Sequence, residues 1–225
     1  MKEKHKYLAL IILEFLTFTL MVVGITFSIC DVRFMGDYPR LSGLPIYMTF
    51  TGLSNIFIGL VCLACAIYRL VKKEKILPKL LFVLKIIALA DISITFITTA
   101  CYLAPSLGAS WWRLYINNNI FNHFLTPVIA IVTFIIFEDY VEISKNYSYF
   151  ALVPIILYGC LYVPNVYSHL NEDGSTNLTY DIYGFARFGP GVLVLFSLVF
   201  IGLSIGFTML FWFINKSKGR KLISS

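Results

Sequence analysis

Long apolar runs separated by short polar segments make up most of the chain. Each run is close to the roughly 20 residues that an α-helix needs to cross the hydrocarbon core of a bilayer. The pattern therefore predicts an all-α membrane protein with six transmembrane helices in a single domain, residues 1–225. The predicted helices cover residues 7–30, 45–70, 80–104, 118–137, 149–166 and 190–214.

The composition agrees with this pattern and excludes an ordinary soluble domain. The chain is 59% hydrophobic and 13% charged, with a mean hydropathy of +0.82, whereas soluble domains are about a quarter charged. The net charge of +6 comes largely from the N-terminus, the second loop and the C-terminal tail. Because Lys and Arg mark the cytoplasmic side, both termini are expected there, in the cell (plasma) membrane. We expect a lipid partner and no nucleic acid.

A few ionisable residues fall within the predicted spans. Glu14 and Lys85 lie at similar depths in helices that both begin on the predicted cytoplasmic side. Pairing lowers the cost of burying either charge, so a Glu14–Lys85 salt bridge is predicted. Asp91 falls near the midplane, where a place in the floor of a site and a structural hydrogen bond are equally good explanations.

The five cysteines all lie in or beside apolar runs. Cys62 and Cys65 form a C-x-x-C pair inside a predicted span, without the second pair that a metal site requires. Both are therefore interpreted as small packing residues. Cys30 and Cys101 fall near the same predicted face, where a disulfide is one alternative.

Two predicted helices carry polar residues at a similar depth. Thr51 and Asn55 lie one turn apart in the second helix, and Asn119 and His123 lie one turn apart in the fourth. Measured from the predicted helix starts at about 1.5 Å per residue, Thr51 and His123 are both roughly 7–9 Å from the outer end. The sequence therefore predicts that these two residues face one another.

A threonine beside a histidine is suited to nucleophilic catalysis. A hydroxyl becomes a good nucleophile when an adjacent base takes its proton, and imidazole performs this role near neutral pH. Such a pair in a membrane is suited to attack the ester carbonyl of an acyl lipid. Thr51 also has a purely structural interpretation, since threonines in membrane helices commonly bond their own backbone, and His123 is a candidate for an interhelical hydrogen bond.

Three short motifs lie in or next to the predicted helices: Phe50-Thr51-x-x-Ser54-Asn55, His123-x-x-x-Pro127, and Tyr183-Gly184-Phe185 followed by Gly189-Pro190-Gly191. In order and spacing they resemble the signature of a six-pass membrane family. This family comprises the androgen-induced and androgen-dependent membrane proteins of animals and their bacterial integral-membrane relatives. The resemblance extends over most of the chain.

The resemblance implies a threonine hydrolase that cleaves fatty-acid esters of hydroxy fatty acids without a metal or cofactor. By motif position, Thr51 is the implied nucleophile and His123 the implied base. Thr49 is a rival nucleophile, because the segment around it also aligns with the threonine of the family. The residues expected to support the site are Asn55, Asn119, Asp91, Ser54 and Tyr183.

Other functions use the same polar residues. A small transporter or ligand-binding protein would use Asp91, His123 and Lys85 as a relay. A more distant six-pass acyltransferase group uses a cysteine, for which Cys101 is the candidate. In a structural subunit, the polar residues would only hold the helices together.

Overall fold

The computed structural model describes residues 3–32, 44–177 and 179–223, and no β-strand occurs among them. This confirms the all-α class. Six helical segments within the described residues are long and apolar enough to cross a membrane, as the hydropathy pattern predicts. These segments are Lys4–Ile29, Phe50–Lys72, Lys79–Ser106, Asn118–Phe137, Lys145–Tyr167 and Pro190–Arg220.

Several of these segments consist of more than one helical element. The longer α-helices are α1 (Glu3–Ile29), α2 (Phe50–Lys72), α3 (Lys79–Thr98), α6 (Thr126–Phe137), α7 (Leu152–Tyr167) and α8 (Pro190–Ile223). Two single turns are α4 (Ala104–Ser106) and α5 (Asn118–Ile120). The 3₁₀ elements are η1 (Leu44–Met48), η3 (Gly108–Tyr115), η5 (Lys145–Ala151) and η6 (Ala186–Phe188), and the π-helical turns are η2 (Thr99–Leu103) and η4 (Phe121–Leu125).

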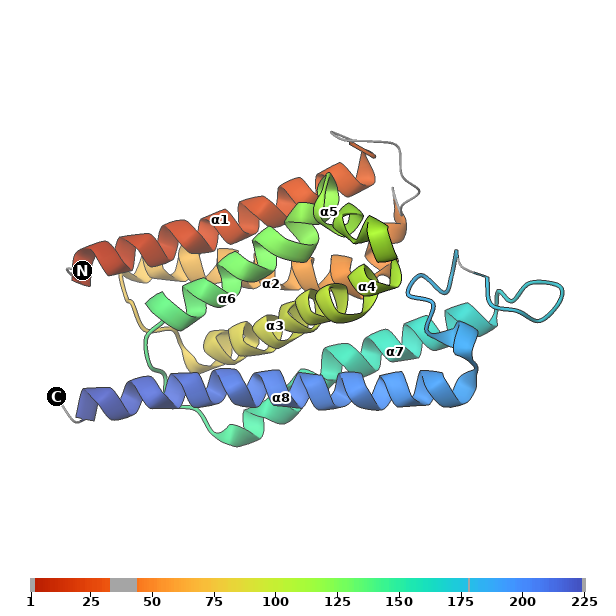
Figure 1. The fold of residues 1–225 in the computed structure, drawn as a ribbon. Helices are drawn as coiled ribbons and strands as arrows, with labels where there is room; N and C mark the ends of the chain where they lie inside the picture. The colour runs from red at the N-terminus through yellow and green to blue at the C-terminus, as the bar shows by residue number, and fades with distance from the viewer. Residues whose placement is uncertain (1–2, 33–43, 178, 224–225) are drawn as a thin grey trace.

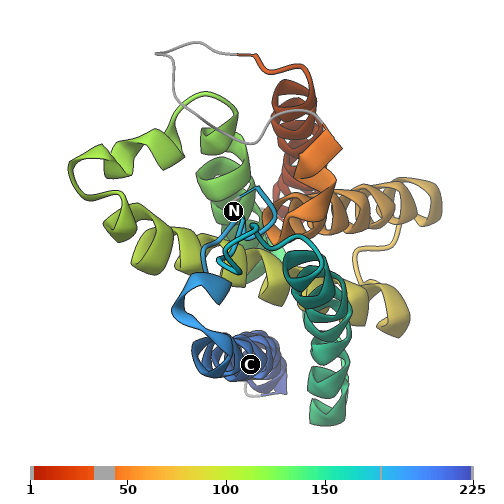
Figure 2. The ribbon, with the colours of Figure 1, turned by 90° about the vertical axis from the view of Figure 1, so that its right-hand side faces the viewer.

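Helix α3 is the centre of the bundle (Figures 1 and 2). It packs against α2, α6 and α8, and 72% of its most apolar stretch is buried. Helices α1, α2, α3 and α6 form the compact part, whereas the stretches containing α7 and α8 are only 17% buried. Both helices therefore expose long apolar faces to the surroundings.

Two of the six membrane-spanning segments differ from the prediction by five residues or more at one end. Helix α2 begins at Phe50 instead of residue 45, because η1 precedes it and Thr49 caps it by accepting a hydrogen bond from the Gly52 N–H. Helix α8 continues to Ile223, beyond residue 214. The Asn215 amide exchanges two hydrogen bonds with the backbone of Val141, at 2.8 and 3.1 Å, which fixes this extension to the segment after α6.

Four buried charges meet at the end of the bundle that carries both termini (Figure 1). The predicted salt bridge is confirmed, with 2.5 Å between Lys85 Nζ and Glu14 Oε1. Arg69 and Glu138, which the sequence did not single out, complete the group: Arg69 contacts Glu14 at 3.2 Å, and Glu138 bonds both Arg69 and Lys85. We call these four residues the charge cluster.

Charge balance explains how the cluster is tolerated. Two carboxylates face two cations, and each long side chain is almost completely buried. Burial raises the pKa of the Glu138 carboxyl, but Lys85 and Arg69 outweigh it and hold that pKa below its usual range. The cluster therefore joins α1, α2, α3 and the end of α6 through salt bridges.

The cysteines are all free thiols. Cys62 and Cys65 pack in the main hydrophobic core, which confirms their interpretation as small packing residues. Cys30 and Cys101 are both exposed and form no disulfide with one another in this structure.

Candidate functional site

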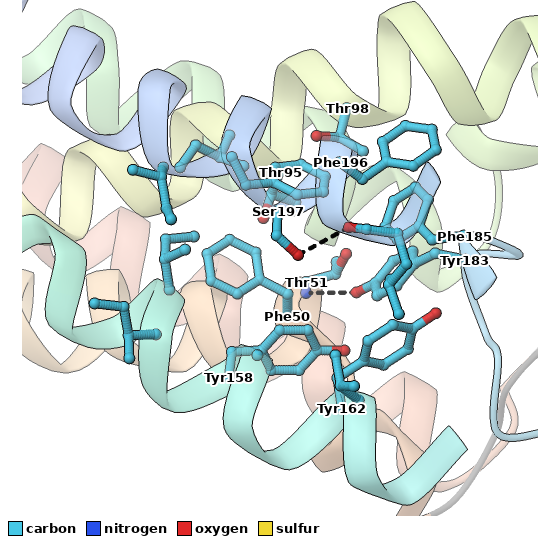
Figure 3. A pocket seen from close by; sticks show the side chains of 18 of the residues that line it. Phe50, Thr51, Thr95, Thr98, Tyr158, Tyr162, Tyr183, Phe185, Phe196 and Ser197 are labelled. Carbon is cyan, nitrogen blue, oxygen red and sulfur yellow. Dashed lines mark hydrogen bonds between the residues drawn. The ribbon is translucent and has the colours of Figure 1, made fainter. Parts of the chain in front are cut away.

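A cavity of about 150 Å³ lies at the end of the bundle opposite the charge cluster (Figure 3). Its walls come from the start of α2, the end of α3, η2, α7 and α8, and the segment before η6 closes it. Most of the lining is aromatic or aliphatic, with a few hydroxyl groups. The labelled residues in Figure 3 are Phe50, Thr51, Thr95, Thr98, Tyr158, Tyr162, Tyr183, Phe185, Phe196 and Ser197.

Thr51 lies in the first turn of α2 and lines the cavity with 8% of its surface exposed. The first N–H groups of a helix lack intrahelical partners, and the Thr51 N–H donates instead to the phenol oxygen of Tyr183 at 3.3 Å. Tyr158 also lines the cavity, and its hydroxyl donates a hydrogen bond to the Met48 carbonyl at 3.1 Å. Three hydroxyl groups, those of Thr51, Tyr158 and Tyr183, therefore mark one end of the cavity.

The Tyr183 phenol stays in its neutral form. Burial raises its pKa, and the neighbouring hydroxyls of Thr51 and Tyr158 oppose this effect only in part. Tyr183 thus presents an O–H donor beside Thr51. The sequence prediction included Tyr183 among the supporting residues. The structure places its hydroxyl oxygen 3.3 Å from the Thr51 nitrogen, although 132 residues separate the two in sequence.

Asp181 holds Tyr183 and Phe185 over the cavity. One of its carboxylate oxygens accepts the Tyr162 hydroxyl, and the other accepts the N–H groups of Ala186 at 3.1 Å and Arg187 at 3.0 Å. Sequence reasoning missed this residue. The signal was available, because Asp at the first and Gly at the fourth position are typical of a type I turn, and the Gly184 N–H indeed bonds the Asp181 carbonyl at 2.8 Å.

Thr49 has a different role from Thr51. Its hydroxyl accepts the Gly52 N–H at 2.9 Å and donates to the Ile46 carbonyl at 2.8 Å. It is buried and does not line the cavity. Ser54, another predicted site residue, bonds the Thr51 carbonyl at 3.1 Å and the Thr95 hydroxyl at 2.7 Å, which ties α2 to α3 beneath the cavity.

His123 lies in the π-helical turn η4, outside the cavity lining. Its Nδ1 is 3.1 Å from the Leu114 carbonyl oxygen. Among the described residues, its imidazole makes no hydrogen bond to Thr51. The structure therefore brings Thr51 to the cavity and His123 to a neighbouring position on another helix.

Asn55 connects the two positions. Its side-chain amide donates to the Thr51 carbonyl at 2.8 Å and to the Asn122 carbonyl at 2.9 Å. The Asn122 carbonyl is available because the π-helical turn gives the Thr126 N–H to Phe121 instead. Since Asn55 is level with Asn122, His123 lies roughly one helical turn, about 5–6 Å, deeper than Thr51. The late start of α2 accounts for this offset from the predicted common depth.

The remaining predicted residues lie around these two. Asp91 is 1% exposed, and its Oδ1 has no hydrogen-bond partner in the described part of the chain. It lies one turn below Thr95 on the same side of α3 and does not itself line the cavity. Asn119 donates to the Arg113 carbonyl at 3.2 Å, close to the carbonyl that His123 contacts.

No group of three or more His, Cys, Asp or Glu side chains that could hold a metal ion occurs within residues 3–32, 44–177 and 179–223. Neither a protein-family model nor a curated protein nor a solved structure matches the chain.

Proposed function

We propose that the protein is a six-pass membrane protein that hydrolyses fatty-acyl esters, such as fatty-acid esters of hydroxy fatty acids, in the cavity. Thr51 is the nucleophile and His123 the base. The observation that carries the proposal is the position of Thr51 in the lining of a cavity whose walls are mostly aromatic and aliphatic. Such a cavity accommodates an acyl chain and presents its ester to a hydroxyl.

The proposed orientation places the charge cluster toward the cytoplasm and the cavity toward the opposite face. It rests on the basic residues of the N-terminus, the segment after α2 and the C-terminal tail. Helices α7 and α8, which bury little of their apolar surface, would face lipid.

The reaction is an acyl transfer to Thr51 followed by hydrolysis. The Thr51 oxygen bonds to the carbonyl carbon while His123 accepts the hydroxyl proton, and the C–O bond to the alcohol then breaks as that proton passes to the leaving oxygen. Water subsequently releases the fatty acid. The O–H group of Tyr183, beside Thr51, would stabilise the oxyanion.

The base must move closer to the nucleophile during the reaction. Catalytic hydrogen bonds in enzymes without substrate are often long or misaligned and tighten in the substrate complex. A shift of η4 relative to α2 would bring His123 toward Thr51. The π-helical turn and Pro127 remove regular backbone hydrogen bonds from this part of the helix, which makes such a shift easier.

The test is a hydrolysis assay on the purified protein in detergent with a series of acyl esters. Thr51→Ala should lower the rate at least about a thousandfold, as expected when a nucleophile is removed. Thr49→Ala is the matched control and should retain most of the activity. A fluorophosphonate should label the unmodified protein and not the Thr51→Ala variant. Hydrolysis that survives Thr51→Ala would exclude the threonine mechanism.

A second candidate is a transporter or ligand-binding protein that holds an acyl lipid without cleaving it. The observation that favours it is the His123 imidazole, which contacts the Leu114 carbonyl and not Thr51. The predicted relay loses one member, because Lys85 is bound within the charge cluster. Saturable binding of an acyl lipid with no ester cleavage would select this function over hydrolysis.

A further inference from the structure

The cavity has a window between α7 and α8. Near one end of the window the Ser204 hydroxyl donates to the Ala151 carbonyl at 2.7 Å, which joins α8 to the last residue of η5, directly before α7. At the other end, Phe185 packs with Tyr162 and Leu193. The helices are therefore connected above and below the cavity, and the lining between these contacts comes from both.

Some side chains in this window line the cavity and are also exposed at the surface of the protein. Ile156 of α7 lines the cavity although 49% of its surface is exposed, and Ser197 of α8 is likewise an exposed lining residue. Figure 3 shows Ser197 directed toward the space in front of Thr51. The cavity thus opens sideways between two helices, at the level of their apolar stretches.

The surface around the window is apolar. Leu157 and Leu161 on α7 and Val194 and Leu198 on α8 are each about 60% exposed. Charged residues are absent from α7 and from residues 190–215 of α8. A window with such a rim is suited to a hydrocarbon chain and unsuited to a polar solute, whose desolvation would not be compensated.

Gly159 provides the room inside the window. It lines the cavity in the middle of α7, where glycine costs about 1 kcal/mol relative to alanine. A Cβ atom at Gly159 would meet no atom within 4 Å, whereas a Cβ at Gly52 or Gly59 would lie within 3 Å of a neighbour. Gly159 therefore does not serve close packing between helices; its effect is to leave space.

We propose that the window admits a hydrocarbon chain of a lipid from the bilayer and that Gly159 determines how much of the chain enters. This inference rests on the proposed function in one respect, since the ester end of the chain would lie at Thr51. The three hydroxyl groups at one end and the apolar window give the bound lipid a single direction.

The experiment uses a fatty acid with a photoreactive diazirine on its chain, added to the protein in phosphatidylcholine vesicles. Labelling should map to the window segments of α7 and α8. Gly159→Leu should reduce it about tenfold, the effect of overfilling a cavity by roughly 1.4 kcal/mol. Gly202→Leu is the matched control, because Gly202 also has open space at its Cβ but does not line the cavity.

Ser197→Leu narrows the same window from α8 and should reduce labelling similarly, so the outcome does not depend on one variant. Equal labelling of the unmodified protein and both window variants overturns the proposal, as does an unlabelled window. Thr51→Ala should keep its labelling. If no ester is hydrolysed while Gly159→Leu still abolishes labelling, the hydrolase proposal fails and the lipid window stands.

Discussion

The polar side chains at the two ends of the bundle are arranged in opposite ways. At one end, the charge cluster pairs two buried carboxylates with two buried cations. At the other end, the hydroxyl groups of Thr51, Tyr158 and Tyr183 are among those that border a space of about 150 Å³. One end pairs its charged groups with one another, and the other leaves hydroxyl groups at the wall of a cavity.

Under the proposed function, this difference separates a structural role from a functional one. Isolated charges inside a protein are prohibitively costly, so a buried pair persists only where each group has its partner. Burying a hydroxyl group without a hydrogen-bond partner costs much less free energy than burying an unpaired charge. Hydroxyl groups can therefore line a cavity. We therefore expect substitutions in the charge cluster to change stability and substitutions around the cavity to change mainly ligand binding or activity.

The largest effect is expected at Lys85. Lys85→Met leaves Glu14 and Glu138 facing Arg69 alone, which should cost about 3–5 kcal/mol of unfolding free energy. Thermal unfolding in detergent, followed by size-exclusion chromatography, measures the loss. Lys79→Met is the control, because Lys79 is an exposed residue of the same helix. The double variant with Glu14→Gln restores charge balance and should recover part of the loss. Similar unfolding of Lys85→Met and Lys79→Met would contradict a stabilising cluster.

A smaller and local effect is expected at Asp181. Asp181→Ala removes the acceptor for one hydroxyl and two backbone N–H groups, which should cost about 2–3 kcal/mol. The loss should appear as faster hydrogen exchange in residues 183–188, with little change in the charge cluster. Asp173→Ala is the control in the same loop, because Asp173 is exposed and its carboxylate bonds the neighbouring Ser175. Unchanged hydrogen exchange in residues 183–188 would show that Asp181 does not hold Tyr183 and Phe185 in place over the cavity.

Thr49→Ala should have a moderate effect on stability. It removes the N-cap of α2 and should cost about 1 kcal/mol. The control is Thr19→Ala, because Thr19 is exposed and its hydroxyl bonds the Phe15 carbonyl of its own helix. The comparison of unfolding temperatures also tests whether Thr49 is a capping residue. A loss of all esterase activity with unchanged stability would assign Thr49 to catalysis instead.

The smallest effect is expected at Asp139, next to Glu138 in sequence. Asp139 pairs with Lys6 at 3.2 Å and Lys75 at 2.9 Å, and these side chains are partly exposed. Asp139→Asn should therefore cost only about 0.2–1 kcal/mol. The difference should shrink in about 1 M salt, where the screening length falls to about 3 Å. A salt-independent loss as large as that of Lys85→Met would remove the distinction between buried and surface pairs.

The sequence by itself determined the helical class, the six apolar segments and one salt bridge. Apolar length and periodicity depend on local composition, which the sequence shows directly. Glu14 and Lys85 could be paired because depth along a helix follows from counting residues. Thr51 could be identified as a polar residue in an apolar segment by the same means.

The tertiary structure decided which of these residues meet. Helix α2 begins five residues later than predicted because Thr49 caps it, and this changes the level of Thr51 relative to His123. Asp181 places Tyr183 beside Thr51 through contacts distant in sequence. The cavity lies between the Ser204–Ala151 hydrogen bond and the packing of Phe185 against Tyr162 and Leu193. Such features depend on rotation and spacing between helices, which the order of residues along one helix does not specify.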